Sequence, residues 1–246
     1  MNGLSLVTNT SVRNNLRLKT TVLILGAVTL ICVAGVALIF CIQLLGPEAR
    51  SAVPDRAKLE AYLGLVLYIT NFMGIGITLN SYAFQNMVRE KTRGSLQALL
   101  ATPLSVTDIW FGKSLSVFLP GLVLGTVMTV LALVIINVIY FMPTIGFLLN
   151  SWIVVSSFVA VPLIYLSLGL LVHLVGLTSK TAVGNVIAQI FLPVMVTLMI
   201  NLMVRDVLDA ASWLFTVMNL GLAGIIGIIV LAIRSRLTPE KIILSG

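Results

Sequence analysis

The stretch Ser114-Leu-Ser-Val-Phe-Leu-Pro-Gly-Leu-Val-Leu-Gly-Thr-Val-Met-Thr-Val-Leu-Ala-Leu-Val-Ile-Ile-Asn137 decides the fold of this protein. It contains no charged side chain from its first residue to its last. About 20 mostly apolar residues are enough for an α-helix to cross the hydrocarbon core of a bilayer. The stretch therefore predicts a membrane-spanning helix.

The composition of the whole chain supports the same interpretation. Of its 246 residues, 59% are hydrophobic and 9% are charged, and the mean hydropathy is +1.13. A soluble globular domain carries about 25% charged residues. So few charges cannot cover the surface of a water-soluble protein of this size, so most of this surface is expected to face lipid.

Six segments have the length and hydropathy of spanning helices, which predicts one all-α, polytopic membrane domain over residues 1–246. With soft boundaries, the predicted spans are residues 20–45, 61–87, 109–141, 151–177, 182–204 and 212–233. The links on one side of the membrane are short, and the longest polar connection, from Val88 to Asp108, lies on the other side.

The lysines and arginines orient the chain. An even number of spans places both termini on one side, which then holds Arg13, Arg17, Lys19, Arg89, Lys91, Arg93, Lys113, Lys180, Arg234, Arg236 and Lys241. The other side holds only Arg50, Arg56, Lys58 and Arg205. Because cytoplasmic loops are enriched in Lys and Arg, both termini are expected in the cytoplasm of a cell-membrane protein. This distribution also argues against nucleic-acid binding, despite the net charge of +7.

The stretch before the first span, Leu4–Leu18, mixes apolar residues with Arg13 and Arg17. This pattern predicts a short helix at the inner membrane interface, held by apolar contacts and by anionic lipid. A disordered tail is the alternative. Within the spans, Gly121 and Gly125 have the small-xxx-small spacing that allows helices to approach closely, and Gly221, Gly224 and Gly227 recur every third residue.

The connection after the second span carries the most informative motif. It reads Val88-Arg-Glu-Lys-Thr-Arg-Gly94-Ser-Leu-Gln-Ala-Leu-Leu100-Ala-Thr-Pro103-Leu-Ser105. After Gly94, the leucines 96, 99 and 100 occupy one face of a short amphipathic helix, and Pro103 ends that helix. Ser105 and Asp108 have the spacing of a capping box, so the third span is expected to start there.

This run resembles the signature of the permeases of type 2 ABC (ABC-2) exporters. The matching order is Glu90, Gly94-Ser95-Leu96, Leu99-Leu100, Thr102-Pro103-Leu104-Ser105, Ile109 and Gly112-Lys113. The resemblance extends to the rest of the chain. The family also has six spans, cytoplasmic termini and a basic C-terminal tail, which here is Arg234–Lys241.

The resemblance implies a permease subunit that pairs with a second permease copy, a homodimer being the expected form, and with separate cytoplasmic ATPase subunits. The chain itself is then no enzyme and binds no cofactor, while ATP and Mg²⁺ belong to the partner ATPase. Carried over, ATPase coupling is assigned to Arg89, Glu90, Lys91, Arg93, Gly94, Ser95, Leu96, Leu99, Leu100, Thr102, Pro103 and Leu104. The alternative is that these charges only fix the topology.

Three other chemistries find little support in the sequence. Gly112-Lys113-Ser114 resembles the end of a phosphate-binding loop, but Thr107 stands at its first glycine position. Cys32 and Cys41 are about 13.5 Å apart along one helix, too far for a disulfide. No spacing of metal ligands is present.

Polar residues inside the spans need a partner or a water-filled path. The candidates for a translocation path are Asn71, Asn80, Asn137, His173, Asn185, Gln189 and Asn201. Interhelical hydrogen bonding is the alternative for each of them.

The absence of charge near mid-membrane favours an amphiphilic or hydrophobic substrate. A secondary transporter driven by an ion gradient is the alternative function, although such proteins usually show intramembrane carboxylates and repeats. An intramembrane enzyme would need a nucleophile with a base, and His173 has no such neighbour in the sequence.

Overall fold

The computed structural model describes residues 3–17, 19–92, 99, 101–143, 145–179, 181–205, 207–235, 237, 238, 240 and 242. Within these ranges the side chains of residues 16, 19–21, 82–92, 181 and 182 are not described. Every element in the described part is helical, and the described ranges contain no strand, which confirms the predicted all-α fold.

The helices follow one another in simple order along the chain. They are α1 (Gly3–Arg17), α2 (Lys19–Phe40), the π-helical turn η1 (Cys41–Leu45), α3 (Gly46–Ala49), α4 (Arg56–Thr92), α6 (Val106–Ile136), the π-helical turn η2 (Asn137–Phe141), α7 (Ser151–Val155), the π-helical turn η3 (Ser156–Ala160), α8 (Val161–Thr178), α9 (Thr181–Val204) and α10 (Trp213–Arg234).

Six helical segments in the described ranges are long and apolar enough to cross a membrane. They are Val22–Ala49, Arg56–Ser81, Val106–Phe141, Ser151–Thr178, Val183–Val204 and Trp213–Arg234. The predicted number of spans is confirmed, and the protein is a multi-pass membrane protein.

Capping residues explain where the spanning helices begin. The Oδ1 atom of Asp55 accepts a hydrogen bond from the backbone N–H of Ala57 at 2.9 Å, and α4 begins directly after it. Asn150 and Ser212 accept comparable bonds from Trp152 and Phe215. Because an N-cap satisfies a backbone donor that has no partner within the helix, α4 starts at residue 56 rather than at the predicted residue 61.

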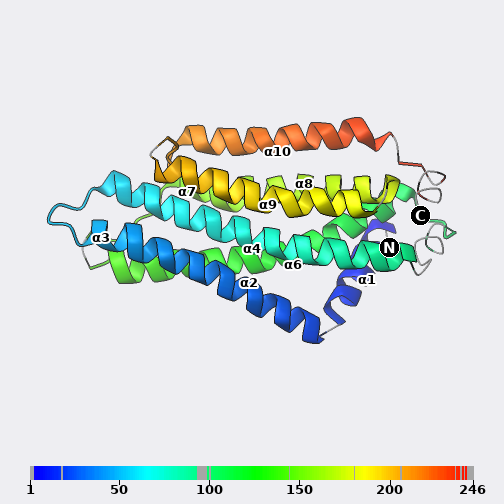
Figure 1. Ribbon diagram of the computed structural model, residues 1–246, viewed down its shortest axis with the longest axis horizontal. Coiled ribbons are helices and arrows are strands. Elements are labelled where there is room, and N and C mark those ends of the chain that lie inside the picture. The colour runs from blue at the N-terminus through cyan, green and yellow to red at the C-terminus, as the bar shows by residue number, and fades with distance from the viewer. Residues whose placement is uncertain are drawn as a thin grey trace.

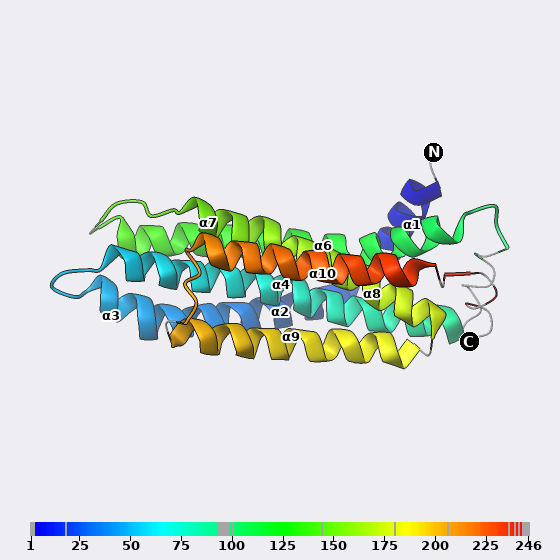
Figure 2. The ribbon, with the colours of Figure 1, turned by 90° about the horizontal axis from the view of Figure 1, so that it is seen from above.

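Helix α4 is the centre of the bundle. In both views it lies among the other long helices, which run roughly parallel to it (Figure 1, Figure 2), and it contacts α2, α6, α8 and α9. Within its most apolar window, 83% of the residues are buried, against 11% for the first span. Polar residues on α4 are therefore the ones most enclosed by protein.

Glycines allow α4 and α6 to pack closely. A Cβ atom placed on Gly74 would lie 2.7 Å from the Cα atom of Gly125, and one on Gly121 would lie 3.1 Å from the carbonyl oxygen of Ile75. The predicted role of Gly121 and Gly125 in close helix approach is therefore confirmed. Gly221 and Gly224 do not lie at a close helix contact, since no atom of the described chain is within 4 Å of a Cβ placed on either of them.

Helix α1 is a formed helix that packs along the first turns of α6. Val7 covers Gly112 so closely that a Cβ atom there would lie 2.8 Å from Val7 Cγ1. Near the other end of α1, Asn15 Nδ2 donates to the carbonyl oxygen of Ser116 at 3.3 Å. Pro120 has no N–H to donate to that carbonyl four residues earlier, so Asn15 bonds a group that the proline leaves free.

Candidate functional site

The residues predicted to couple to an ATPase lie between α4 and α6. Arg89, Glu90 and Lys91 belong to the last turns of α4, of which the backbone is described. Leu99, Thr102, Pro103 and Leu104 are described individually. Residues 93–96 and Leu100 lie outside the described residues, so the predicted coupling helix over this stretch remains a prediction.

The described part of this connection forms a tight turn. Both the backbone N–H and the hydroxyl of Thr102 donate to the carbonyl oxygen of Leu99, at 3.2 Å and 2.6 Å. The chain leaves helical geometry before Pro103, as predicted.

Ser105 is the N-cap of α6, as predicted, although Asp108 bonds the Ser105 hydroxyl instead of the Ser105 backbone N–H of a full capping box. The Asp108 N–H donates to Ser105 Oγ at 3.0 Å, and the Ser105 hydroxyl donates to Asp108 Oδ2 at 2.6 Å. Both ends of the described turn are therefore fixed by hydrogen bonds.

An apolar cluster joins this connection to three spanning helices. We call it the terminal cluster, because it lies at the end of the bundle that also carries α1 and the end of α10 (Figure 1). Its buried members are Ile109, Trp110, Leu174, Leu177, Val230 and Ile242, and Leu99, Leu104, Val106, Phe111, Leu170, Leu171, Ile233 and Leu237 pack against them. The connection thus contacts α6, α8 and α10 through one continuous set of side chains.

Trp110 fixes the geometry of the terminal cluster. Its side chain is buried, and its indole Nε1–H donates to the carbonyl oxygen of Leu170 at 3.0 Å. This bond ties the first turns of α6 to α8, in addition to the apolar contacts. The first turns of α6 are therefore attached to both the connection and α8.

The Gly112-Lys113-Ser114 sequence lies inside α6, where Gly112 is covered by Val7. The Ser114 hydroxyl donates to the carbonyl of Trp110 at 2.9 Å, four residues earlier in the same helix. Residues 112–114 therefore lie in the interior of a helix. A phosphate-binding loop lies before the start of its helix, so these three residues do not form one. In the described ranges, His, Cys, Asp and Glu residues form no group of three that could hold a metal ion.

The predicted path residues occupy different environments. Asn71, Asn137 and His173 are buried, Asn80 and Asn185 are half-buried, and Gln189 and Asn201 are exposed.

The hydrogen bonds of these residues are mostly local. Asn137 fixes the link after the third span, since its Oδ1 accepts from the Leu148 N–H at 2.7 Å. His173 and Asn201 bond carbonyls of their own helices. In the described chain, no hydrogen bond joins two of the seven, and their role as a path remains a prediction.

Asn71 is the most enclosed of these side chains. Its Nδ2 atom donates to the carbonyl oxygen of Ser157 at 2.5 Å, so α4 is joined to the π-helical turn η3. Its Oδ1 atom and the Ser157 hydroxyl are buried without a hydrogen-bond partner among the described residues. Single π-helical turns inside α-helices occur frequently at functional sites.

One buried hydrogen-bonded pair was not predicted from the sequence. The hydroxyl of Tyr68 on α4 donates to Asn219 Oδ1 on α10 at 2.5 Å, and the Tyr68 ring contacts Phe215 edge to face. Two signals pointed toward it: an Asn in an apolar run, and a Tyr whose hydroxyl needs a partner when buried. The pairing itself depends on which faces of α4 and α10 meet, and the sequence does not show this.

These features define a polytopic α-helical membrane protein in which a polar connection is packed against the ends of several spans. The chain matches no known protein-family model, no curated protein and no solved structure.

Proposed function

We propose that the chain is the permease subunit of an ATP-driven exporter of the ABC-2 type, located in the cell membrane with both termini in the cytoplasm. It works with separate ATPase subunits and with a second permease copy. The terminal cluster is the observation that carries the proposal, because it joins the connection that bears the ABC-2-like motif to α6, α8 and α10.

The proposed mechanism uses this cluster as a mechanical link. ATP-driven closure of the partner subunits pushes on residues 90–104. Leu99 and Leu104 transfer the movement to Trp110 and its neighbours in the terminal cluster. The bond from Trp110 to the Leu170 carbonyl keeps α6 and α8 together, so both helices move when the cavity changes from inward to outward opening.

The position of the acidic residues favours a substrate without strong positive charge. The described acidic side chains 48, 55, 60, 108, 209 and 240 lie at or beyond the ends of the spans. A carboxylate in the bilayer interior is the usual partner for a cationic solute or for a coupling proton. An amphiphilic or hydrophobic substrate fits this distribution better, and so does coupling to ATP rather than to an ion gradient.

The test is to express the tagged full-length chain in its native host, extract it gently and identify the proteins that co-purify. The expected result is a soluble ATPase in stoichiometric amount, which is lost in Glu90→Gln and in Gly94→Leu. The matched control is Glu48→Gln, which removes a carboxylate at the other end of the bundle and should retain the ATPase.

The opposite outcome is equally informative. If no ATPase accompanies the wild-type chain, the ATP-driven mechanism is wrong. Transport by the purified chain in vesicles, driven by an ion gradient, would then be measured. An ATPase that remains bound to both the Glu90 and the Gly94 variants would place the docking surface elsewhere on the chain.

A further inference from the structure

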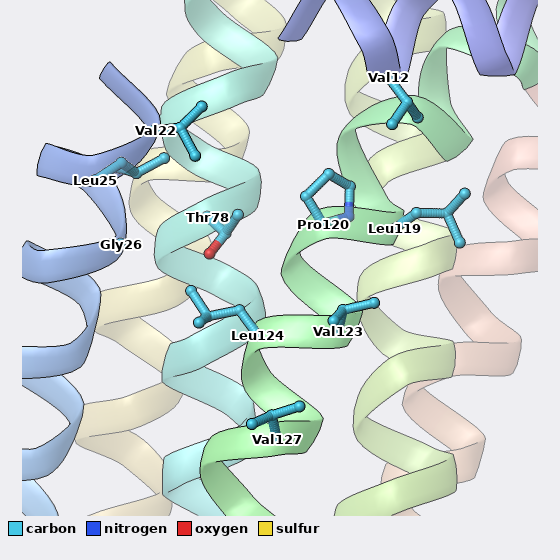
Figure 3. A pocket seen from close by; sticks show the side chains of 10 residues that line it. All are labelled: Val12, Val22, Leu25, Gly26, Thr78, Leu119, Pro120, Val123, Leu124 and Val127. Atoms are coloured by element: carbon cyan, nitrogen blue, oxygen red, sulfur yellow. The ribbon is translucent and has the colours of Figure 1, made fainter. Parts of the chain in front are cut away.

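An apolar groove lies between the N-terminal helix and the first three spans. Its volume is about 540 Å³, which is in the range of small-molecule sites, about 300–1,000 Å³. Figure 3 shows side chains from α1, α2, α4 and α6 lining it, with Val12 of α1 at one end and Val127 of α6 at the other. The lining residues are Val12, Val22, Leu25, Gly26, Thr78, Leu119, Pro120, Val123, Leu124 and Val127.

Among the described residues that line it, the groove has no free polar side-chain group. Thr78 is the one polar side chain among these described lining residues, and its hydroxyl donates to the Gly74 carbonyl within α4 at 2.8 Å. The side of α6 that faces the groove is open, since Val123 is 63% exposed and Val127 is 50% exposed. An open apolar wall on a spanning helix faces lipid, so a hydrocarbon chain is the natural occupant.

The length of the groove fits one lipid tail. Leu119 and Val127 are eight residues apart, which corresponds to about 12 Å along an α-helix. The hydrocarbon core of one leaflet is about 15 Å thick, half of the ~30 Å of the bilayer. The groove is therefore nearly as long as one leaflet is thick, and Val12 of α1 lies at one end of it.

Helix α1 adds positive charge at that end. Arg13 follows the groove residue Val12, and Arg17 lies one turn further on the same face. Both side chains are exposed, and α1 contains no acidic residue. In the sequence, Arg17 lies between the two groove-lining residues Val12 and Val22. The contacts of Val7 and Asn15 attach α1, which carries these arginines, to α6.

We propose that this groove binds one acyl chain of an anionic phospholipid, whose headgroup is held by Arg13 and Arg17. Lipid tails are as apolar as the groove, so the tail alone does not select one lipid from the bilayer. Selection comes from the charge, because each arginine near an anionic headgroup contributes about a fivefold preference. The proposal needs only a membrane-embedded chain, and it holds whether or not an ATPase is the partner.

The test uses the purified full-length chain in detergent with a mixture of phosphatidylglycerol and phosphatidylcholine that carry the same two oleoyl chains. Native mass spectrometry then measures how much of each lipid stays bound. The wild-type chain is expected to retain phosphatidylglycerol in preference to phosphatidylcholine, with one lipid bound most strongly. Arg13→Gln combined with Arg17→Gln should lose this preference, a change of roughly 25-fold for two arginines.

A second pair of variants separates the groove from the general lipid-facing surface. Val123→Trp fills the groove and is expected to lose the strongly bound phosphatidylglycerol. Val134→Trp is the matched control, because Val134 is 48% exposed on the same helix and lies outside the groove. Arg50→Gln, at the other end of the bundle, is the control for lost charge, and both controls should bind lipid like the wild type.

Two outcomes would overturn the proposal. Equal retention of the two lipids by the wild-type chain would show that the surface binds annular lipid without selection. Equal retention of phosphatidylglycerol by Val123→Trp and Val134→Trp would show that the lipid lies elsewhere.

Discussion

At the scale of single residues, two buried tyrosines make a matched test of interior hydrogen bonding. The Tyr68 hydroxyl donates to Asn219 Oδ1, whereas the Tyr165 hydroxyl is buried without a partner among the described residues. Tyr68→Phe leaves Asn219 Oδ1 without its donor, so we expect a loss of about 1 kcal/mol in the free energy of unfolding. Tyr165→Phe removes a hydroxyl that makes no bond, so it should be neutral or stabilising.

Unfolding of the purified variants in mixed micelles, followed by circular dichroism, measures this difference. Both substitutions remove one oxygen from a buried aromatic side chain, so each serves as the control for the other. Adding Asn219→Leu to Tyr68→Phe should restore part of the lost stability, since both partners are then apolar. Equal destabilisation by the two single changes would show that the Tyr68–Asn219 bond contributes nothing measurable.

At the scale of helices, the sequence predicted features that lie within one helix, such as its length and its cap. It did not predict the contacts between two helices. The six spans and the Ser105–Asp108 cap were predictable, because hydropathy and capping are read along one stretch of chain. The burial of Asn71 and the exposure of Asn201 were not, since both are Asn residues in apolar runs. Their environments depend on how each helix is rotated toward its neighbours. The contact between Asn15 and Ser116 was not predictable for the same reason, because it depends on how α1 packs against α6.

The docking of α1 on α6 gives the prediction at this scale. Asn15 donates to the Ser116 carbonyl that Pro120 cannot bond. In Pro120→Ala, residue 120 gains an N–H that donates to this carbonyl, so the carbonyl no longer needs the Asn15 side chain as its donor. Asn15→Ala alone should therefore increase amide hydrogen exchange in α1 about fivefold, which corresponds to a bond of ~1 kcal/mol. In the Pro120→Ala background, Asn15→Ala should have a smaller effect, because the bond to the Ser116 carbonyl then no longer depends on Asn15.

Mass spectrometry of peptides from α1 measures the exchange, and the peptides of α10 provide the internal reference. An Asn15→Ala effect of the same size in both backgrounds would show that Asn15 holds α1 by some other contact. A second variant checks the apolar half of the contact. In Gly112→Ala, the new methyl group would lie 2.8 Å from Val7 Cγ1, so α1 must shift and its exchange should rise.

At the scale of the whole molecule, the direction of insertion is the next property to test, because the terminal cluster can meet a cytoplasmic ATPase only if it lies inside the cell. The distribution of Lys and Arg predicts that both termini are cytoplasmic. Ser51, exposed between α3 and α4, is then outside, and Ser235, exposed after α10, is inside. Cys32 and Cys41 are free thiols and would be replaced by alanine before a single cysteine is introduced at either position.

Labelling with a membrane-impermeant maleimide then decides the orientation. Ser51→Cys should react in intact cells, and Ser235→Cys should react only after the membrane is permeabilised. Each position is the control for the other, since both lie in polar segments beyond the ends of spanning helices. The reverse pattern would place the terminal cluster outside the cell, where no ATP is available to a partner, and ATP-driven export through this connection would be excluded. The expected pattern leaves the co-purification of an ATPase as the deciding experiment.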